Sequence, residues 1–156
     1  MKYRLKHERG FTLLLAALVG SLVLALGLSI VAIVRKSVTL SSIGRDSQFA
    51  FYAADTAAEC ALYWDIRHSK FASSTPPGDL RCDGETLALT TPGSPPFVEP
   101  YQITFQYEPN GYCAQVTVLK SAAHPRTRIV ADGYSVTCAE ITQSARSLQR
   151  SVELRY

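Results

Sequence analysis

The stretch FTLLLAALVGSLVLALGLSIVAIV, from Phe11 to Val34, contains no charged residue. As an α-helix its 24 residues would be about 36 Å long, enough to cross a hydrocarbon core of about 30 Å. In lipid only a helix satisfies the backbone hydrogen bonds of a lone segment. The run exceeds the apolar part of a secretory signal, and Arg35-Lys36-Ser37-Val38 follows it in place of a small-residue cleavage site. Residues 11–34 are therefore predicted to form a transmembrane helix.

The basic excess of the chain lies in residues 1–10. Of the 16 Lys+Arg and 13 Asp+Glu, four basic residues and only Glu8 precede Phe11, so the remainder holds 12 of each kind. A basic tip before an apolar run keeps an N-terminus on the cytoplasmic side, although Arg35 and Lys36 flank the other end. The neutral remainder argues against nucleic acid as a partner. The leader charges are Lys2, Arg4, Lys6 and Arg9.

Beyond Val34 the chain contains no proline until Pro76, and its pattern becomes amphipathic. Small and apolar residues recur at helical spacing over residues 43–64, and alanine fills the middle of this stripe. The pattern favours one helix from about residue 11 to about residue 68, with residues 35–70 as its amphipathic half. Two helices broken near Gly44 are the alternative. The residues expected to pack are Ala50, Ala54, Ala57 and Ala61.

Residues 71–100 are rich in proline and glycine and predict an irregular loop region, with a short strand possible at 86–90. From Tyr101 the side chains alternate with a period of two, which predicts strands at 101–107 and 112–120 around an Asn-Gly turn.

Two further strands are predicted at 128–137, with Gly133 as a bulge, and at 146–156. The short connections make residues 101–156 an antiparallel meander, and one face of it must be covered. The predicted fold class is therefore α+β, with a long N-terminal helix whose alanine stripe packs on a C-terminal antiparallel sheet.

All four cysteines follow the apolar run, and no two form a C-x-x-C pair. If the run crosses a membrane, they face an oxidising compartment, where an even count favours two disulfides. Free buried thiols are the alternative, and the spacings lack the close ligand pairs of a zinc site. We expect the pairs Cys60–Cys82 and Cys113–Cys138, and the second pair requires the bulge at Gly133 to shift the strand register.

No catalytic or phosphate-binding motif occurs in the sequence. The histidines are isolated from one another, at His7, His68 and His124. Asp55 and Glu59 lie four residues apart, but an exposed polar helix face explains them. We therefore expect no enzyme, no metal and no cofactor.

The residues Arg9-Gly10-Phe11-Thr12-Leu13 resemble the prepilin peptidase site of type IV pilins and of the pseudopilins of type II secretion. In that family the peptidase cuts after the glycine, and the exposed residue, usually phenylalanine, is N-methylated. The resemblance implies cleavage after Gly10 and methylation of Phe11. The leader, the span, the amphipathic helix and the sheet extend it over the whole chain. The segment from Phe51 to Leu62 looks like the helix of minor, PilX-like subunits.

One position departs from the family's main subunits, which carry glutamate as the fifth residue of the mature protein. Counted from Phe11, this position is Leu15. In the family the glutamate pairs with the N-terminal amine of a neighbouring subunit, and tip-type minor subunits also lack it. The resemblance therefore implies a minor pilin or pseudopilin at or near the tip of a filament.

The implied partners are prepilin peptidase, membrane lipid, and other pilin or pseudopilin subunits packed through the N-terminal helix. The implied location is the cytoplasmic membrane, crossed once with the N-terminus inside, and then a cell-surface filament. Two alternatives share these features. One is an uncleaved signal-anchored protein with an exported binding domain. The other is a minor pilin of a DNA-uptake machine, against which the neutral charge beyond the leader argues.

Overall fold

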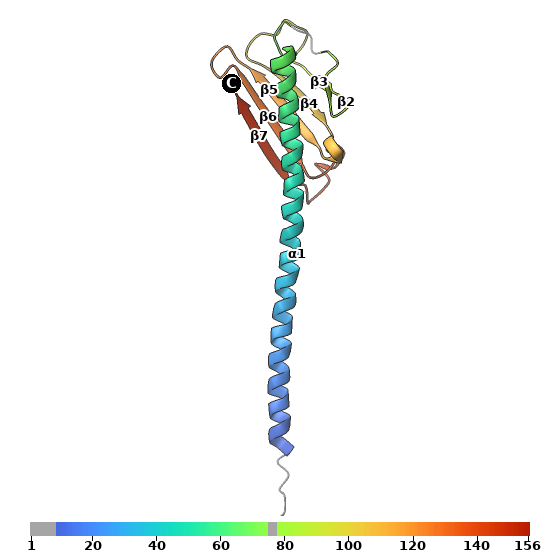
Figure 1. Cartoon of the computed structure of the whole chain (residues 1–156), viewed down its shortest axis with the longest axis vertical. Coiled ribbons are helices and arrows are strands. Elements are labelled where there is room, and N and C mark those ends of the chain that lie inside the picture. The colour runs from blue at the N-terminus through green and yellow to red at the C-terminus, as the bar shows by residue number, and fades with distance from the viewer. Residues whose placement is uncertain (1–8, 75–77) are drawn as a thin grey trace, which may run out of the picture. The chain divides into compact units, whose positions relative to one another are not determined.

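The computed structural model describes residues 9–74 and 78–156, and the side chains among them from Phe11 onward (Figure 1). The chain divides into two compact units, Met1–Ile43 and Gly44–Tyr156. The predicted leader residues Lys2, Arg4 and Lys6 lie outside the described residues. Arg9 and Gly10 form the beginning of the helix α1 (Arg9–His68).

The helix α1 is continuous from Arg9 to His68 and has no break at Gly44, so the prediction of one long helix is confirmed. Every side chain from Phe11 to Ile43 is exposed. The apolar part of the helix reaches a mean hydropathy of 2.7, and none of it is buried within the chain. By length and composition, α1 can cross a membrane.

The second unit contains a five-stranded sheet in which every neighbouring pair is antiparallel, and the order of strands in the sheet is their order in the chain. A separate ribbon pairs two shorter strands, and it lies with the first sheet strand in the region predicted to be irregular. The sheet strands are β3 (Ala88–Thr90), β4 (Tyr101–Tyr107), β5 (Ala114–Lys120), β6 (Thr127–Tyr134) and β7 (Gln149–Arg155), and the ribbon is β1 (Arg81–Cys82) with β2 (Glu85–Thr86).

The core lies between one face of this sheet and the part of α1 that begins at Gly44 (Figure 1). Along β4 to β6 alternate side chains are buried, as the period of two predicts. The helix contributes small side chains, and the sheet contributes the large ones. Because these side chains are alanines, the helix backbone lies close to the strands. The long helix packed on an antiparallel sheet confirms the predicted α+β class. The predicted packing residues Ala50, Ala54, Ala57 and Ala61 are all fully buried.

Gly133 is not a bulge, and the prediction of one there was wrong. It pairs with Ala114 in a register that continues without interruption to Lys120 opposite Thr127. A Cβ atom at position 133 would lie 2.0 Å from the carbonyl oxygen of Ala50 and 2.5 Å from the amide nitrogen of Ala54. Glycine is therefore needed because the helix backbone crosses the strand at this point, and not because of its backbone angles.

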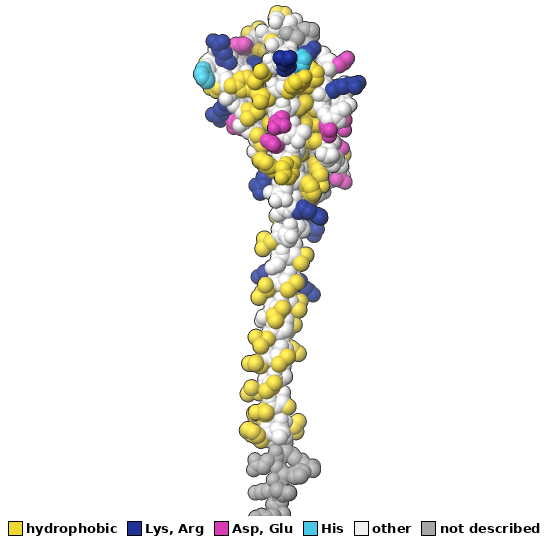
Figure 2. Space-filling view, in the orientation of Figure 1, with side chains coloured by type: hydrophobic (Ala, Val, Ile, Leu, Met, Phe, Trp, Pro, Cys, Tyr) yellow, Lys and Arg dark blue, Asp and Glu magenta, His cyan; other side chains and the backbone are white. Residues whose placement is uncertain are grey.

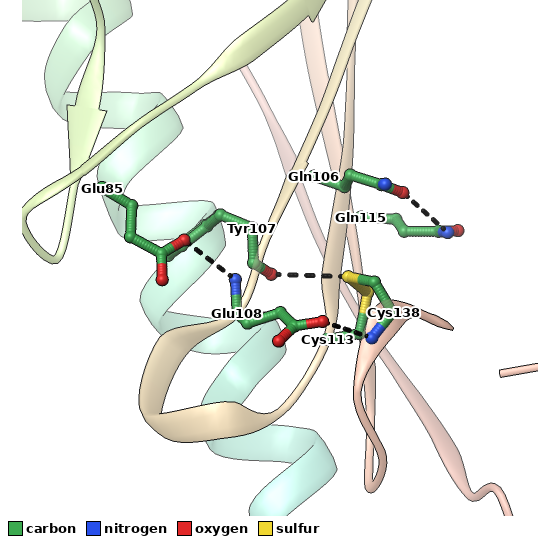
Figure 3. Close-up of a disulfide and its surroundings, with 7 residues drawn as sticks. All are labelled: Glu85, Gln106, Tyr107, Glu108, Cys113, Gln115 and Cys138. Atoms are coloured by element: carbon green, nitrogen blue, oxygen red, sulfur yellow. Dashed lines mark hydrogen bonds between the residues drawn. A yellow bond between two sulfur atoms is a disulfide. The ribbon is translucent and has the colours of Figure 1, made fainter. Parts of the chain in front are cut away.

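The shift in register occurs just beyond the end of β6. The amide of Tyr134 donates to the carbonyl of Cys113, whereas the amide of Cys113 donates to the carbonyl of Val136. In an uninterrupted ladder the amide of Cys113 would bond to Tyr134, so its acceptor has moved two residues along the chain. The shift brings Cys138 over Cys113, and the two form a disulfide with a Cα–Cα distance of 4.7 Å (Figure 3).

The carboxylate of Glu108 also holds Cys138 in place. The amide of Cys138 donates to Oε1 of Glu108 at 2.7 Å, and the amide of Glu108 donates to Oε2 of Glu85 at 3.4 Å (Figure 3). The turn between β4 and β5, the ribbon and the segment after β6 are thereby joined at one end of the sheet.

The first disulfide joins the end of the helix to the ribbon. Cys60 and Cys82 are bonded with a Cα–Cα distance of 6.0 Å, and the indole Nε1 of Trp64 donates to the carbonyl of Arg81 at 3.0 Å. Both predicted pairings are therefore confirmed, and no described cysteine is free.

Removing either disulfide should lower the free energy of unfolding by about 3 kcal/mol, because each closes a loop of 22 or 25 residues in the unfolded chain. We expect this loss in Cys60→Ser/Cys82→Ser and in Cys113→Ser/Cys138→Ser. Denaturant unfolding followed through the fluorescence of Trp64, the only tryptophan, measures it. A loss below 1 kcal/mol in both double variants would contradict the prediction.

Candidate functional site

The candidate site is the helix α1, which carries the predicted processing motif near its N-terminus and an outward face near its C-terminus. Gly10 lies within the helix, and the side chains of Phe11 and Leu15 are 66% and 52% exposed. Neither side chain is buried by any other part of the described chain. Residue 15 thus presents a branched aliphatic side chain at a position open to lipid or to another chain.

Two serine hydroxyls in the apolar half of the helix are hydrogen-bonded within the helix. The hydroxyl of Ser21 donates to the carbonyl of Leu18, and that of Ser29 donates to the carbonyl of Ala25, both at 2.9 Å. Such bonds to the preceding turn remove the need for water at these side chains. The exposed segment is therefore compatible with hydrocarbon along its length.

The alanine stripe is taken up by the chain's own sheet and is not available to another protein. The opposite face of α1 is open: Tyr52, Tyr63 and Ile66 are 63%, 55% and 65% exposed. Asp55 is half-buried and Glu59 is exposed on the same face, as expected for a polar helix surface. Figure 2 shows acidic side chains bordered by hydrophobic ones over the part of α1 that lies in front of the sheet in Figure 1.

An apolar hollow of about 290 Å³ adjoins this face, between the helix and the turn that joins β4 to β5. The ring of Phe49 stacks on that of Tyr112, with centroids 4.8 Å apart. Both rings line the hollow, and so does Tyr52. The residue pattern alone did not indicate this hollow, because it depends on how the turn folds back against the helix.

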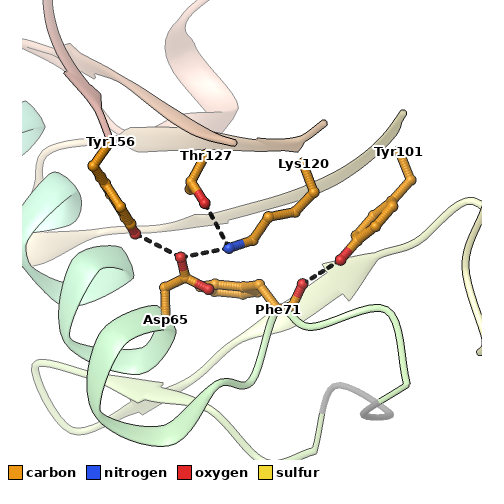
Figure 4. Close-up of polar contacts among 6 residues, drawn as sticks. All are labelled: Asp65, Phe71, Tyr101, Lys120, Thr127 and Tyr156. Atoms are coloured by element: carbon orange, nitrogen blue, oxygen red, sulfur yellow. Dashed lines mark hydrogen bonds and ion pairs between the residues drawn. The ribbon is translucent and has the colours of Figure 1, made fainter. Parts of the chain in front are cut away.

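A buried charge pair ties the end of α1 to the sheet (Figure 4). Asp65 is 8% exposed, and its Oδ2 accepts from Nζ of Lys120 at 2.6 Å and from the hydroxyl of Tyr156 at 2.5 Å. Lys120 also donates to the hydroxyl of Thr127 at 2.8 Å. All of these partners belong to the fold, so the cluster is structural. The sequence offered one sign of it, since Asp65 continues the spacing of the alanine stripe.

The tyrosine beside this cluster is held in its neutral form. The hydroxyl of Tyr101 donates to the carbonyl of Phe71 at 2.7 Å (Figure 4). Burial, together with the charges of Glu99 and Asp65, raises the pKa of Tyr101 to about 12. The group donates a hydrogen bond throughout the ordinary pH range and is not a proton-transfer residue.

The outer face of the sheet carries an exposed charge triad. Glu153 accepts from Arg155 and, at 2.5 Å, from Arg128, and these bonds lower the pKa of Glu153 to about 2. Such pairs are worth little at a solvated surface. The two described histidines show no catalytic arrangement: His68 is hydrogen-bonded to the hydroxyl of Tyr63 at 3.1 Å, and His124 is exposed in a loop. His7 lies outside the described residues. Residues 9–74 and 78–156 hold no group of three His, Cys, Asp or Glu side chains that could bind a metal.

Comparison of the chain with protein-family models, with curated proteins and with solved structures found no match.

Proposed function

We propose that this protein is a minor subunit of a type IV pilin-like filament, either a pilus or a secretion pseudopilus. The observation that carries the proposal is the course of α1. An exposed, uncharged helical segment follows the Arg-Gly-Phe-Thr-Leu motif directly and continues without a break into a helix that packs on an antiparallel sheet. A filament needs both halves, because the first packs subunits together and the second carries the exported domain.

The proposal gives each part of the chain a task. The basic leader keeps the N-terminus in the cytoplasm, the apolar half of α1 spans the inner membrane, and the disulfide-bonded unit lies outside it. Prepilin peptidase removes the leader at Gly10 and methylates Phe11. Lipid, and later the helices of other subunits, cover the exposed apolar side chains. No chemical step is assigned to the chain.

The test is the N-terminus of the protein purified from membranes. We expect mass spectrometry to find a mature chain that begins at a methylated Phe11, and Gly10→Val to leave the precursor uncut. The matched control is Gly20→Val, another glycine of the same helix, with open space around it. This control should be processed normally. An intact Met1 in the unaltered protein would support the uncleaved signal-anchored alternative and defeat the filament role.

We further propose that the subunit sits at or near the tip of its filament. A subunit with Leu15 presents no glutamate to the amine of a subunit ahead of it, so it needs no predecessor. Its own amine at Phe11 can still accept the glutamate of the next subunit. An apolar side chain also costs nothing in lipid, whereas an unpaired charge there costs a few kcal/mol.

Immunogold labelling of sheared filaments tests the position. We expect label at one end and a marked loss of filaments when the protein is deleted. Label spaced along the shaft, or filaments that form normally without the protein, would show instead that Leu15 is tolerated in an ordinary minor subunit.

A further inference from the structure

The outward face of α1 has the spacing of a helix–helix contact. Five residues, which we call the outward seam, follow one another at intervals of three, four, four and three. This is the repeat by which one helix presents a narrow stripe to another. Three members are large and mostly exposed, although a solvated helix face has no need of such side chains. The outward seam is Tyr52, Asp55, Glu59, Tyr63 and Ile66.

The charges of the outward seam are of one sign and lack partners. Neither Asp55 nor Glu59 forms an ion pair or a side-chain hydrogen bond in the described part of the chain. Asp65, on the same helix, is instead paired with Lys120. The two carboxylates occupy the middle of the seam, and apolar side chains occupy its ends. A partner that covered the ends with apolar groups would bring its own side chains against both carboxylates.

A second copy of this chain does not suit that position. In a membrane, copies insert with the same orientation, and parallel helices in register would set Asp55 and Glu59 against the same two residues of the other copy. Like charges in close contact are destabilising, and they serve to reject a wrong partner. A helix with basic residues at this level would gain two ion pairs in the same place.

We propose that the outward seam docks the helix of a different subunit, parallel to α1, which carries Lys or Arg opposite Asp55 and Glu59. The inference rests on the proposed filament function and specifies the partner of the same helix. Leu15 cannot make the contact by which a glutamate at this position would select a neighbouring subunit. The outward seam would select the neighbour instead. The apolar ends hold the partner, and the carboxylates decide which helix is held.

A variant of this chain with Lys at positions 55 and 59 can serve as the probe, because it presents a helix with basic residues opposite Asp55 and Glu59. Full-length protein in detergent micelles would carry a reporter cysteine at Gln48, an exposed residue one turn before Tyr52 on the same stripe. One preparation keeps the seam, and the other carries Asp55→Lys/Glu59→Lys with a tag of different mass. A short bismaleimide links the reporter thiols and leaves the native disulfides intact, so that homodimers and heterodimers are separated by size.

We expect the mixed pair to give at least five times the linked product of either preparation alone, and added salt to remove most of that gain. The matched control, Asp79→Lys/Glu140→Lys, reverses two exposed carboxylates elsewhere and should give no gain. Tyr52→Ser/Tyr63→Ser in both chains should return the mixed pair to the background yield. Equal yields for mixed and identical pairs, or a mixed yield that survives loss of both tyrosines, would overturn the proposal.

The N-terminus of the unaltered protein purified from membranes separates this inference from the filament role. Charge-dependent linkage together with an intact Met1 would support the outward seam and defeat the filament role. A mature chain that begins at a methylated Phe11, without charge-dependent linkage, would support the filament role and overturn the outward seam.

Discussion

Gly133→Ala should lower the free energy of unfolding by about 3 kcal/mol, the upper end of the usual cost of overpacking. The added methyl would meet the Ala50 carbonyl oxygen at 2.0 Å and the Ala54 amide nitrogen at 2.5 Å. In an α-helix these atoms accept and donate the same hydrogen bond, so neither can turn aside as a flexible side chain would. The helix must move away from β6 and lose its contact with the sheet. Denaturant unfolding of the full chain in detergent, followed through Trp64, measures the effect.

Gly44→Ala is the matched control for this substitution. Nothing lies within 4 Å of a Cβ at that position, and the residue is helical. Alanine there should stabilise the helix by roughly 0.5–1 kcal/mol, because it restricts the unfolded chain and favours the helix. If the two glycines responded alike, the close crossing at Gly133 would be refuted.

Lys120→Met should cost about 3 kcal/mol, because it leaves the carboxylate of Asp65 buried without its counter-charge. Methionine keeps the length of the stem, so the loss reports the charge more than the packing. Thermal unfolding monitored by near-ultraviolet circular dichroism measures the change. The double variant Asp65→Asn/Lys120→Met should recover at least half of it, since no buried charge remains.

An exposed pair provides the comparison. Arg128→Met removes one of the two partners of Glu153 at the outer surface of the sheet, and it should leave the stability nearly unchanged. A loss as large as that of Lys120→Met would mean that the position of the pair, inside or outside, does not decide its contribution.

Local patterns predicted the elements of the fold well. The uncharged run and the alanine stripe predicted a helix to about residue 68, and it ends at His68. The alternation from Tyr101 to Tyr107 matches β4 at both ends. The turn after it contains Asn110 and Gly111, both with positive φ, as an Asn-Gly pair favours.

The errors lie where a residue's role depends on a distant segment. Gly133 could serve a bulge or a close crossing, and only the position of Ala50 in space decides between them. The strand predicted to reach residue 137 ends at Tyr134, because the chain leaves the ladder to place Cys138 over Cys113. The strand predicted from residue 146 begins at Gln149.

The candidate site divides in the same way. The processing motif and Leu15 are visible in the sequence because they are linear, and they stay predictions until the N-terminus is measured. The spacing of Asp65 after the alanine stripe was a sign of its burial, but its partners Lys120 and Tyr156 were not predictable, since they lie far along the chain. The outward seam needed the structure as well, because only the burial of the alanines shows which side of the helix is left open.

The order of the strands bears on how the chain can fold as it is synthesised. Each strand of the sheet after β3 pairs with the strand that precedes it in the chain, so its pairing partner has already been synthesised. The cysteines behave in the same way: Cys60 bonds to the next cysteine along the chain, and Cys113 to the one after it. An oxidant acting on thiols in order of arrival would form both native bonds first. Such a chain can reach its native disulfide pairing without a reshuffling step.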